Sequence, residues 1–251
     1  MGSDSRIEWT EASWNPVTGC SPVSEACEHC YAERMARRLQ AMGSQNYRNG
    51  FRLTLHEHML ELPLHWRKPR LVFVNSMSDL FHAEVPFDFI ARVFAVMQSC
   101  RHHVFQILTK RPKKLAAFAA RLEHWPANVW MGVTVENDRH FDRVRILQTI
   151  PAPVRFLSCE PLLGPIERLP LEGIHWVIVG GESGPGARPM AAGWVRALRR
   201  QCREAGCAFY FKQWGGVRKD LTGRKLDGRV YDAAPEPIER PGELVFGGVS
   251  S

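Results

Sequence analysis

Short apolar segments recur along the chain at regular intervals, and they limit the folds that it can adopt more than any other feature. They span residues 71–77, 104–109, 129–136, 154–158, 176–179 and 208–211. Several are apolar throughout, which is typical of parallel strands that are buried on both faces. Amphipathic stretches of helical period separate most of them, notably residues 87–100, 113–122 and 193–205. The alternation predicts an α/β fold, a partial βα barrel of about six or seven βα units.

Two segments depart from this alternation. Residues 43–70, which include the run GSQNYRNG, break the rhythm, and we expect an insertion after the first helix. Beyond Gly215 the chain becomes rich in glycine and proline and loses its periodicity. We therefore expect a barrel domain over residues 1–215 and a C-terminal extension, a tail or lid, over residues 216–251.

The composition favours a protein that needs neither disulfides nor a membrane. With 251 residues and 45% hydrophobic content, the chain can bury a full core as one large domain. Seven cysteines are an odd number for a disulfide scaffold, and no apolar run approaches the length of a membrane span. Polar residues follow Met1 where a signal peptide would be apolar. We expect a cytoplasmic, reduced protein.

The formal net charge of +7 permits binding to a polyanion. Basic residues gather in four segments, at residues 34–38, 110–114, 196–203 and 218–229. Arginines on solvated helix faces would account for most of this charge. A nucleic acid or a nucleotide-derived substrate is the functional alternative, and both interpretations stay open.

Three cysteines, Cys20, Cys27 and Cys30, lie in the sequence TGCSPVSEACEHCYAE. The segment is rich in turn-forming residues, follows a short strand predicted around residues 7–14, and leads into a helix predicted over residues 31–41. A C-x2-C pair lets two sulfurs reach one centre, and thiolates are the preferred ligands of soft metals and iron–sulfur clusters. The spacing therefore predicts a metal centre held by these three cysteines.

The number of thiolates distinguishes the kinds of centre. A structural zinc ion would require a fourth ligand, which His29 or a distant residue would supply. A [4Fe–4S] cluster held by three cysteines keeps one iron open for a substrate or cofactor. Cysteines buried as small apolar residues are the third alternative, but the polar and turn-forming neighbours of these three are unusual for a core.

Polar residues stand at or just beyond the end of nearly every predicted strand. In a βα barrel these ends form one mouth, where active sites are built, and the cysteine loop would join them there. The simpler explanation is that strand ends are polar because the chain leaves the core at that point. The residues concerned are Asn75, Ser76, Asp79, Thr109, Lys110, Thr134, Glu136, Cys159, Glu160, Glu182, Lys212 and Gln213.

The three-cysteine loop, the helix after it and the repeated βα units resemble the radical SAM superfamily, whose usual spacing is C-x3-C-x2-C. This chain has six residues between the first two cysteines, so only the C-x2-C half matches. A fuller resemblance, over nearly the whole chain, is to the phage-type three-cysteine-motif family of unknown function. It is carried by the runs WNPVTGC, CYAE, NSMSDLF, LTKRP, GVTVEN, FLSCEPLLGPI, GGESGPGARP and FKQWG.

The resemblance implies a radical SAM-like variant of the TIM barrel, a [4Fe–4S] cluster and S-adenosylmethionine. The expected activity is reductive cleavage of this cofactor followed by hydrogen abstraction from a substrate. Such an enzyme requires an electron donor, such as a reductase or a flavodoxin-like protein, and leaves room for a further partner protein. The alternatives are a zinc-binding, nucleic-acid-interacting protein without catalysis and a barrel with a purely structural cluster.

Specific roles follow for the residues of the predicted mouth. We assign cofactor binding to Asn75, Ser76, Asp79, Glu136, Glu182 and Lys212, and catalysis to Cys159, Lys110 and Glu160. Cys159 ends a strand, so its thiol is a candidate hydrogen donor to a substrate radical, with a buried structural cysteine as the alternative. Glu182 follows two glycines that permit close backbone approach, although a plain glycine turn explains them equally well.

Overall fold

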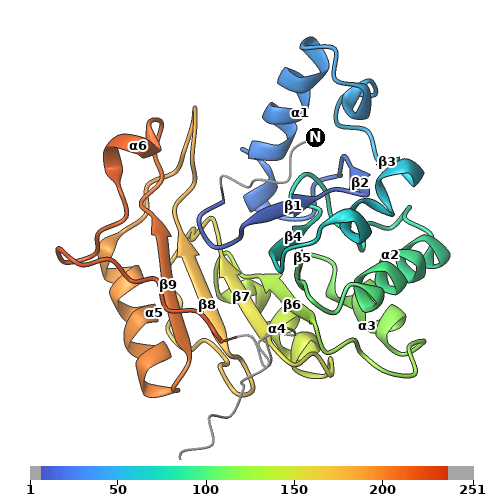
Figure 1. Cartoon of the computed structure of the whole chain (residues 1–251). Helices are drawn as coiled ribbons and strands as arrows, with labels where there is room; N and C mark the ends of the chain where they lie inside the picture. Colours follow the sequence, from blue (N-terminus) through green and yellow to red (C-terminus); the bar gives the residue numbers. More distant parts are fainter. Residues whose placement is uncertain (1–6, 237–251) are drawn as a thin grey trace, which may run out of the picture.

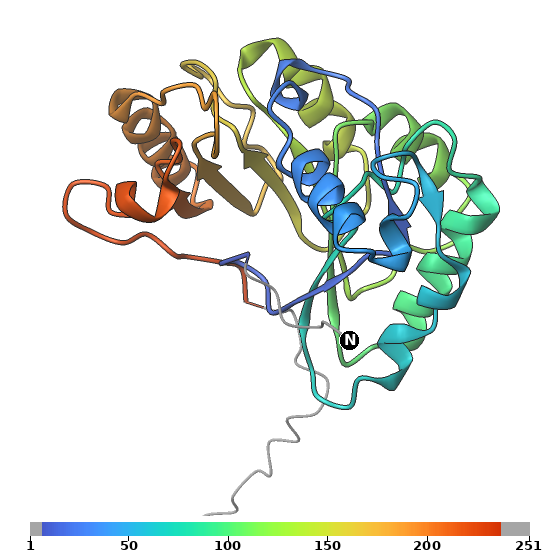
Figure 2. The same cartoon turned by 90° about the horizontal axis from the view of Figure 1, so that it is seen from above.

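Seven parallel strands form one curled sheet, and their order across the sheet is the same as their order along the chain. The computed structural model describes residues 7–236. Figures 1 and 2 show that the sheet curls into an open half-barrel, so the predicted partial βα barrel is confirmed. In order across the sheet, the strands are β1 (Ala12–Trp14), β4 (Leu71–Val74), β5 (Val104–Thr109), β6 (Val129–Thr134), β7 (Arg155–Cys159), β8 (Trp176–Gly180) and β9 (Ala208–Gln213).

Helices join most of the strands, as the amphipathic stretches predict. They are α1 (Tyr31–Ala41), α2 (Phe87–Ser99), α3 (Pro112–Ala119), α4 (Phe141–Gln148), α5 (Ala192–Glu204) and the short α6 (Lys219–Thr222). In Figure 1, α1 and α6 stand beyond the carboxyl ends of the strands, on opposite sides of the opening. Within residues 7–236, none of the helices is both long enough and apolar enough to cross a bilayer.

The sheet separates two hydrophobic clusters because neighbouring side chains of a strand point to opposite faces. One cluster combines strand residues such as Val133 and Leu157 with helix residues such as Ile90 and Leu198. The other contains no helix residue and therefore fills the concave face of the half-barrel. Its buried members are Trp9, Phe73, Trp130, Val154, Phe156, Trp176, Ile178 and Tyr210.

The segment between α1 and β4, where the sequence predicts an insertion, is built from short elements. It contains β3 (Thr54–Leu55), which pairs antiparallel with β2 (Val17–Thr18). Short 3-10 turns complete it, at η2 (Gln45–Tyr47), η3 (Glu57–Met59) and η4 (Leu62–His65). Two further turns lie elsewhere, at η1 (Glu25–Cys27) and η5 (Asp138–His140).

The C-terminal segment attaches to the barrel beside β9. The Phe211 amide donates to the Tyr231 carbonyl (2.8 Å), and the Trp176 indole donates to the Ala233 carbonyl (2.9 Å). A separate tail or lid from residue 216 stays a prediction, since part of it, residues 237–251, falls outside the described residues.

Candidate functional site

Cys20, Cys27 and Cys30 surround the junction of two cavities. Cys20 follows β2, Cys27 ends η1 and Cys30 directly precedes α1. All three carry free, half-buried thiols. An outer cavity of about 810 Å³ is lined by α1 and residues 49–53, and an inner cavity of about 130 Å³ is lined by the ends of β4, β5 and β6. The three cysteines and Phe51 line both cavities, so a centre held by the thiols would stand between them.

Cys20, Cys27 and Cys30 give the candidate site a donor set of three thiols. A tetrahedral zinc ion requires sulfurs that meet about 2.3 Å from one point. Within residues 7–236, no group of three His, Cys, Asp or Glu side chains has an arrangement that could hold one metal ion. Three thiols spaced around a shared cavity suit a cluster in which each thiolate binds a different iron.

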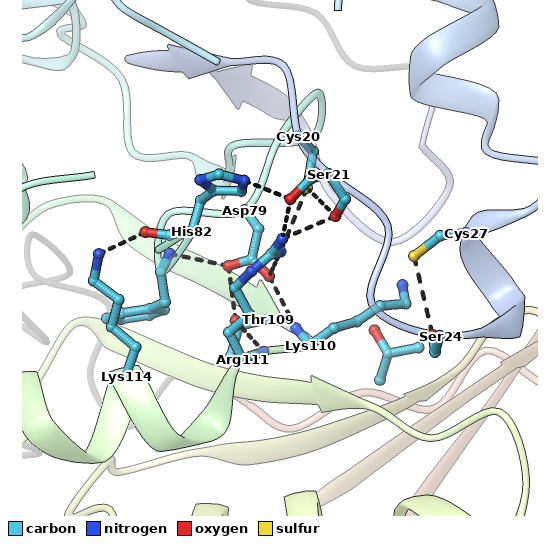
Figure 3. Close-up of polar contacts among 12 residues, drawn as sticks. Cys20, Ser21, Ser24, Cys27, Asp79, His82, Thr109, Lys110, Arg111 and Lys114 are labelled. Carbon is cyan, nitrogen blue, oxygen red and sulfur yellow. Dashed lines mark hydrogen bonds and ion pairs between the residues drawn. The ribbon is translucent and has the colours of Figure 1, made fainter. Parts of the chain in front are cut away.

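Cys20 is held by the end of β5 and the loop after β4 (Figure 3). Arg111 donates one hydrogen bond to the Cys20 sulfur (3.4 Å) and another to Asp79 Oδ2 (3.2 Å). Asp79 also accepts from the Thr109 hydroxyl (2.7 Å) and from the Lys110 amide (3.1 Å). Burial raises the pKa of the Cys20 thiol, and the Arg111 guanidinium acts in the opposite direction.

Glu136, just beyond β6, holds the middle of the cysteine loop. Its carboxylate is completely buried and accepts from the Ser24 hydroxyl (2.7 Å) and from Arg143 (2.9 Å). His140 Nε2 lies 3.1 Å from the same carboxylate. Arg143 compensates the buried charge, which would otherwise be costly.

Glu182, just beyond β8, holds the end of the same loop. It accepts three hydrogen bonds from Arg188, at 2.6, 2.9 and 3.0 Å, and lies 3.0 Å from His29 Nδ1. Burial alone would raise the pKa of Glu182, but the hydrogen bonds from Arg188 and His29 outweigh it and lower the pKa to about 2. His29 Nδ1 is therefore engaged by Glu182, an arrangement that metal-binding histidines also show, so a zinc ion with His29 as its fourth ligand stays a prediction.

Asn75 and Thr134 line the inner cavity, and each has a buried polar atom without a hydrogen-bond partner among the described residues. The Asn75 Oδ1 accepts from the Val17 amide (3.1 Å), but its Nδ2 is buried without a partner, as is the Thr134 hydroxyl. Ser76 also lines this cavity and donates to Asn15 Oδ1 (3.2 Å). Buried polar groups nearly always have hydrogen-bond partners, so the two free groups indicate a bound ligand or water.

The charged residues predicted for catalysis fall into two places. Lys110 lines the inner cavity. Glu160 and Lys212 form an ion pair of 3.1 Å at the ends of β7 and β9, and the Ser158 hydroxyl donates to Glu160 (3.2 Å). Burial alone would lower the pKa of Lys212, but Glu160 outweighs it and raises the pKa.

Cys159 lies away from both cavities. It is completely buried in the cluster between the sheet and the helices, together with Leu157 and Cys202. This desolvation raises the pKa of its thiol. The placement favours the alternative of a structural cysteine, and the role as a hydrogen donor stays a prediction.

Several residues that shape the site were not predicted from the sequence. Ser24 and His29 lie in the cysteine loop, and although His29 was predicted as an alternative zinc ligand, neither residue was expected to contact a strand-end carboxylate. Arg143 and Arg188 gave no signal, because an arginine six or seven residues beyond a glutamate pairs with it only after the intervening loop has folded back.

These features define a class of protein, a parallel βα half-barrel with a three-cysteine loop at the carboxyl ends of its strands. The chain belongs to the family described as protein of unknown function DUF5131, whose sequence profile matches residues 4–235. No curated protein matches the chain.

Among solved structures, the chain is similar to mutants of spore photoproduct lyase. A cysteine-to-serine mutant gives a TM-score of 0.49 at 11% identity, over 81% of this chain and 64% of that chain. A double mutant with bound AdoMet and dinucleoside spore photoproduct gives a TM-score of 0.47 at 9% identity, with the same coverage. The chain thus spans 64% of the length of these structures.

Proposed function

We propose that this chain is an iron–sulfur enzyme of the radical SAM type. The observation that carries the proposal is the position of three free cysteines from one loop, which line two adjoining cavities at the carboxyl ends of a parallel half-barrel. Active sites of βα barrels lie at this end. Cys20, Cys27 and Cys30 would hold a [4Fe–4S] cluster, which when bound supplies the electron for reductive cleavage of S-adenosylmethionine.

The two adjoining cavities together are the proposed site of the cofactor, because the inner one, at about 130 Å³, can take only part of a molecule whose usual site measures about 300–1,000 Å³. Asn75 Nδ2 and the Thr134 hydroxyl are free to bond a ligand, and the Lys110 side chain adds a positive charge to the same wall. Asn75 and Ser76 therefore keep the cofactor-binding role predicted from the sequence. The residues orient the ligand and replace the water that would otherwise solvate it.

The Glu160–Lys212 pair is the proposed contact with substrate. It places an acceptor and a donor side by side at the opening, where neither group lines the two cavities next to the cysteines. We propose a nucleic acid or a nucleotide-derived molecule as substrate, since the chain carries a net charge of +7. Because cleavage consumes an electron, an external donor such as a flavodoxin-like protein is required, and the free thiols fit a reducing, cytoplasmic location.

Thr134→Val tests the cofactor site through two effects of opposite sign. Valine has the shape of threonine without the hydroxyl, so removal of a buried, unpaired group should leave the midpoint of thermal unfolding unchanged or raise it. The same change removes a ligand hydrogen bond, so affinity for S-adenosylmethionine should fall about fivefold to tenfold. Calorimetric titration of the anaerobically reconstituted protein measures the affinity, and 5′-deoxyadenosine formed with dithionite measures cleavage.

The wild-type protein provides the reference for this experiment. It should bind S-adenosylmethionine and release 5′-deoxyadenosine when reduced. A cluster-loaded wild-type protein that neither binds nor cleaves the cofactor would support a purely structural cluster instead. Equal affinities of wild type and Thr134→Val would move the cofactor away from the inner cavity.

A further inference from the structure

The cysteine loop, residues 20–30, has little structure of its own. Its one regular element is the single turn η1 (Glu25–Cys27), and its internal backbone hydrogen bonds are those of that turn, such as Cys27 to Ser24 (2.9 Å). Such a segment has a high conformational entropy unless external contacts fix it. The contacts that fix it come from the ends of the strands.

Two buried carboxylates supply these contacts on either side of Cys27. Glu136 accepts from Ser24, three residues before Cys27, and Glu182 faces His29, two residues after it. Neither carboxylate touches a thiol, yet Cys27 and Cys30 lie within the stretch that they hold. The two anchors lie just beyond β6 and β8, so the loop is tied to two strand ends that have β7 between them.

An arginine reinforces each anchor, and Arg188 also extends its anchor to the loop backbone. Arg188 bonds Glu182 and also donates to the Glu25 carbonyl (2.9 Å) and to the Glu28 carboxylate (3.3 Å). On the other side, Asn137 donates to the Glu25 carboxylate (2.6 Å). Charge-assisted hydrogen bonds of this kind are about twice as strong as neutral ones.

Most of the hydrogen-bonding capacity of Glu182 is used within the protein. A carboxylate offers about four lone-pair positions. The Arg188 backbone amide, Arg188 Nε and His29 Nδ1 all contact Oε2, and Arg188 Nη2 contacts Oε1. The side chain is only 5% exposed, so a ligand amine would have to compete with these contacts for a buried carboxylate.

We propose that Glu136 and Glu182 are positioning residues that hold the cysteine loop in its metal-binding conformation before any metal arrives. The inference rests on the proposed function, since an ordered loop is useful here only if it binds a cluster. A loop that is already ordered binds a cluster without the entropic cost of ordering. It changes the role assigned to both residues, from contact with S-adenosylmethionine to support of the ligands.

Hydrogen–deuterium exchange on the reduced, metal-free protein tests the proposal. In Glu182→Gln, Glu136→Gln, His29→Ala and Ser24→Ala, backbone amides of residues 21–30 should exchange about tenfold faster than in wild type. Exchange in β5 should stay unchanged, which separates local loosening from global unfolding. Glu160→Gln is the matched control, because Glu160 lies at the same edge but pairs with Lys212 outside the loop.

The two loop-side variants keep the test decisive if a glutamine variant fails to fold. Ser24→Ala and His29→Ala remove the same contacts without leaving Arg143 or Arg188 beside an uncharged partner. Loop exchange that is equal in wild type, Ser24→Ala and His29→Ala overturns the proposal, as does an equal acceleration in Glu160→Gln.

Iron retention separates this proposal from the proposed function. After anaerobic reconstitution, Glu182→Gln and His29→Ala should lose iron to a chelator about tenfold faster than wild type and Glu160→Gln. If the wild type binds no iron, the proposed function fails while the exchange experiment still decides the role of the two glutamates. Faster iron loss with unchanged loop exchange would overturn positioning in favour of a direct effect on the metal.

Discussion

Cys30→Ala should fold normally yet hold no iron–sulfur cluster and cleave no S-adenosylmethionine. The substitution leaves only two of the three thiolates that hold a [4Fe–4S] cluster with one open iron. The iron content should therefore fall from about four per chain to nearly zero. The variant should still fold because Cys30 is only half-buried and directly precedes α1. Iron and sulfide analysis after anaerobic purification, with 5′-deoxyadenosine as the activity readout, measures both effects.

Cys159→Ala is the matched control for this prediction. Cys159 is also a free thiol at a strand end, but it is completely buried between the sheet and the helices. Its replacement should cost about 1–2 kcal/mol of stability through lost packing and leave iron content and cofactor cleavage unchanged. Equal losses of iron in the two variants would contradict the assignment of the cluster to the cysteine loop.

Gly181→Ala is expected to destabilise the fold more than any other substitution considered for this chain. A Cβ atom at this position would lie 1.9 Å from the Trp214 carbonyl oxygen, and a backbone atom cannot move aside as a flexible side chain can. The close crossing of the two backbones places Glu182 toward the cysteine loop. We expect a loss of more than about 4 kcal/mol, measured by denaturant unfolding, or a failure to accumulate as soluble protein.

Gly193→Ala is the control for the glycine prediction. Gly193 lies in the first turn of α5, and a Cβ atom there would meet nothing within 4 Å. The substitution should be neutral or stabilise the protein by up to about 1 kcal/mol, because alanine has the higher helix propensity. Unfolding midpoints that are equal in the two variants would show that the crossing at Gly181 is less tight than the structure indicates.

The sequence predicted the fold closely because apolar periodicity reports burial. The helix expected over residues 31–41 is α1 (Tyr31–Ala41), and the stretch 87–100 contains α2 (Phe87–Ser99). The strand expected over residues 71–77 ends earlier, at Val74, because Asn75 adopts a left-handed conformation with φ of 60°. Propensity alone does not show such a turn, and the apolar Met77 extended the predicted strand beyond it.

The site was predicted less completely because pairwise contacts leave little trace in a single sequence. Strand ends correctly placed Glu136 and Glu182 at the mouth, but their arginine partners became visible only in the structure. Cys159 illustrates the other limit. The sequence of a strand that is apolar on both faces does not show which side chains point toward the helices and which toward the concave face. Cys159 and its neighbour Ser158 therefore could not be assigned to faces.

Metal analysis of the wild-type protein, purified and handled anaerobically, tests the central claim most directly. A [4Fe–4S] cluster at Cys20, Cys27 and Cys30 predicts a brown protein with about four irons and about four sulfides per chain. Stoichiometric zinc without sulfide would contradict the claim and favour a zinc-binding, nucleic-acid-interacting protein.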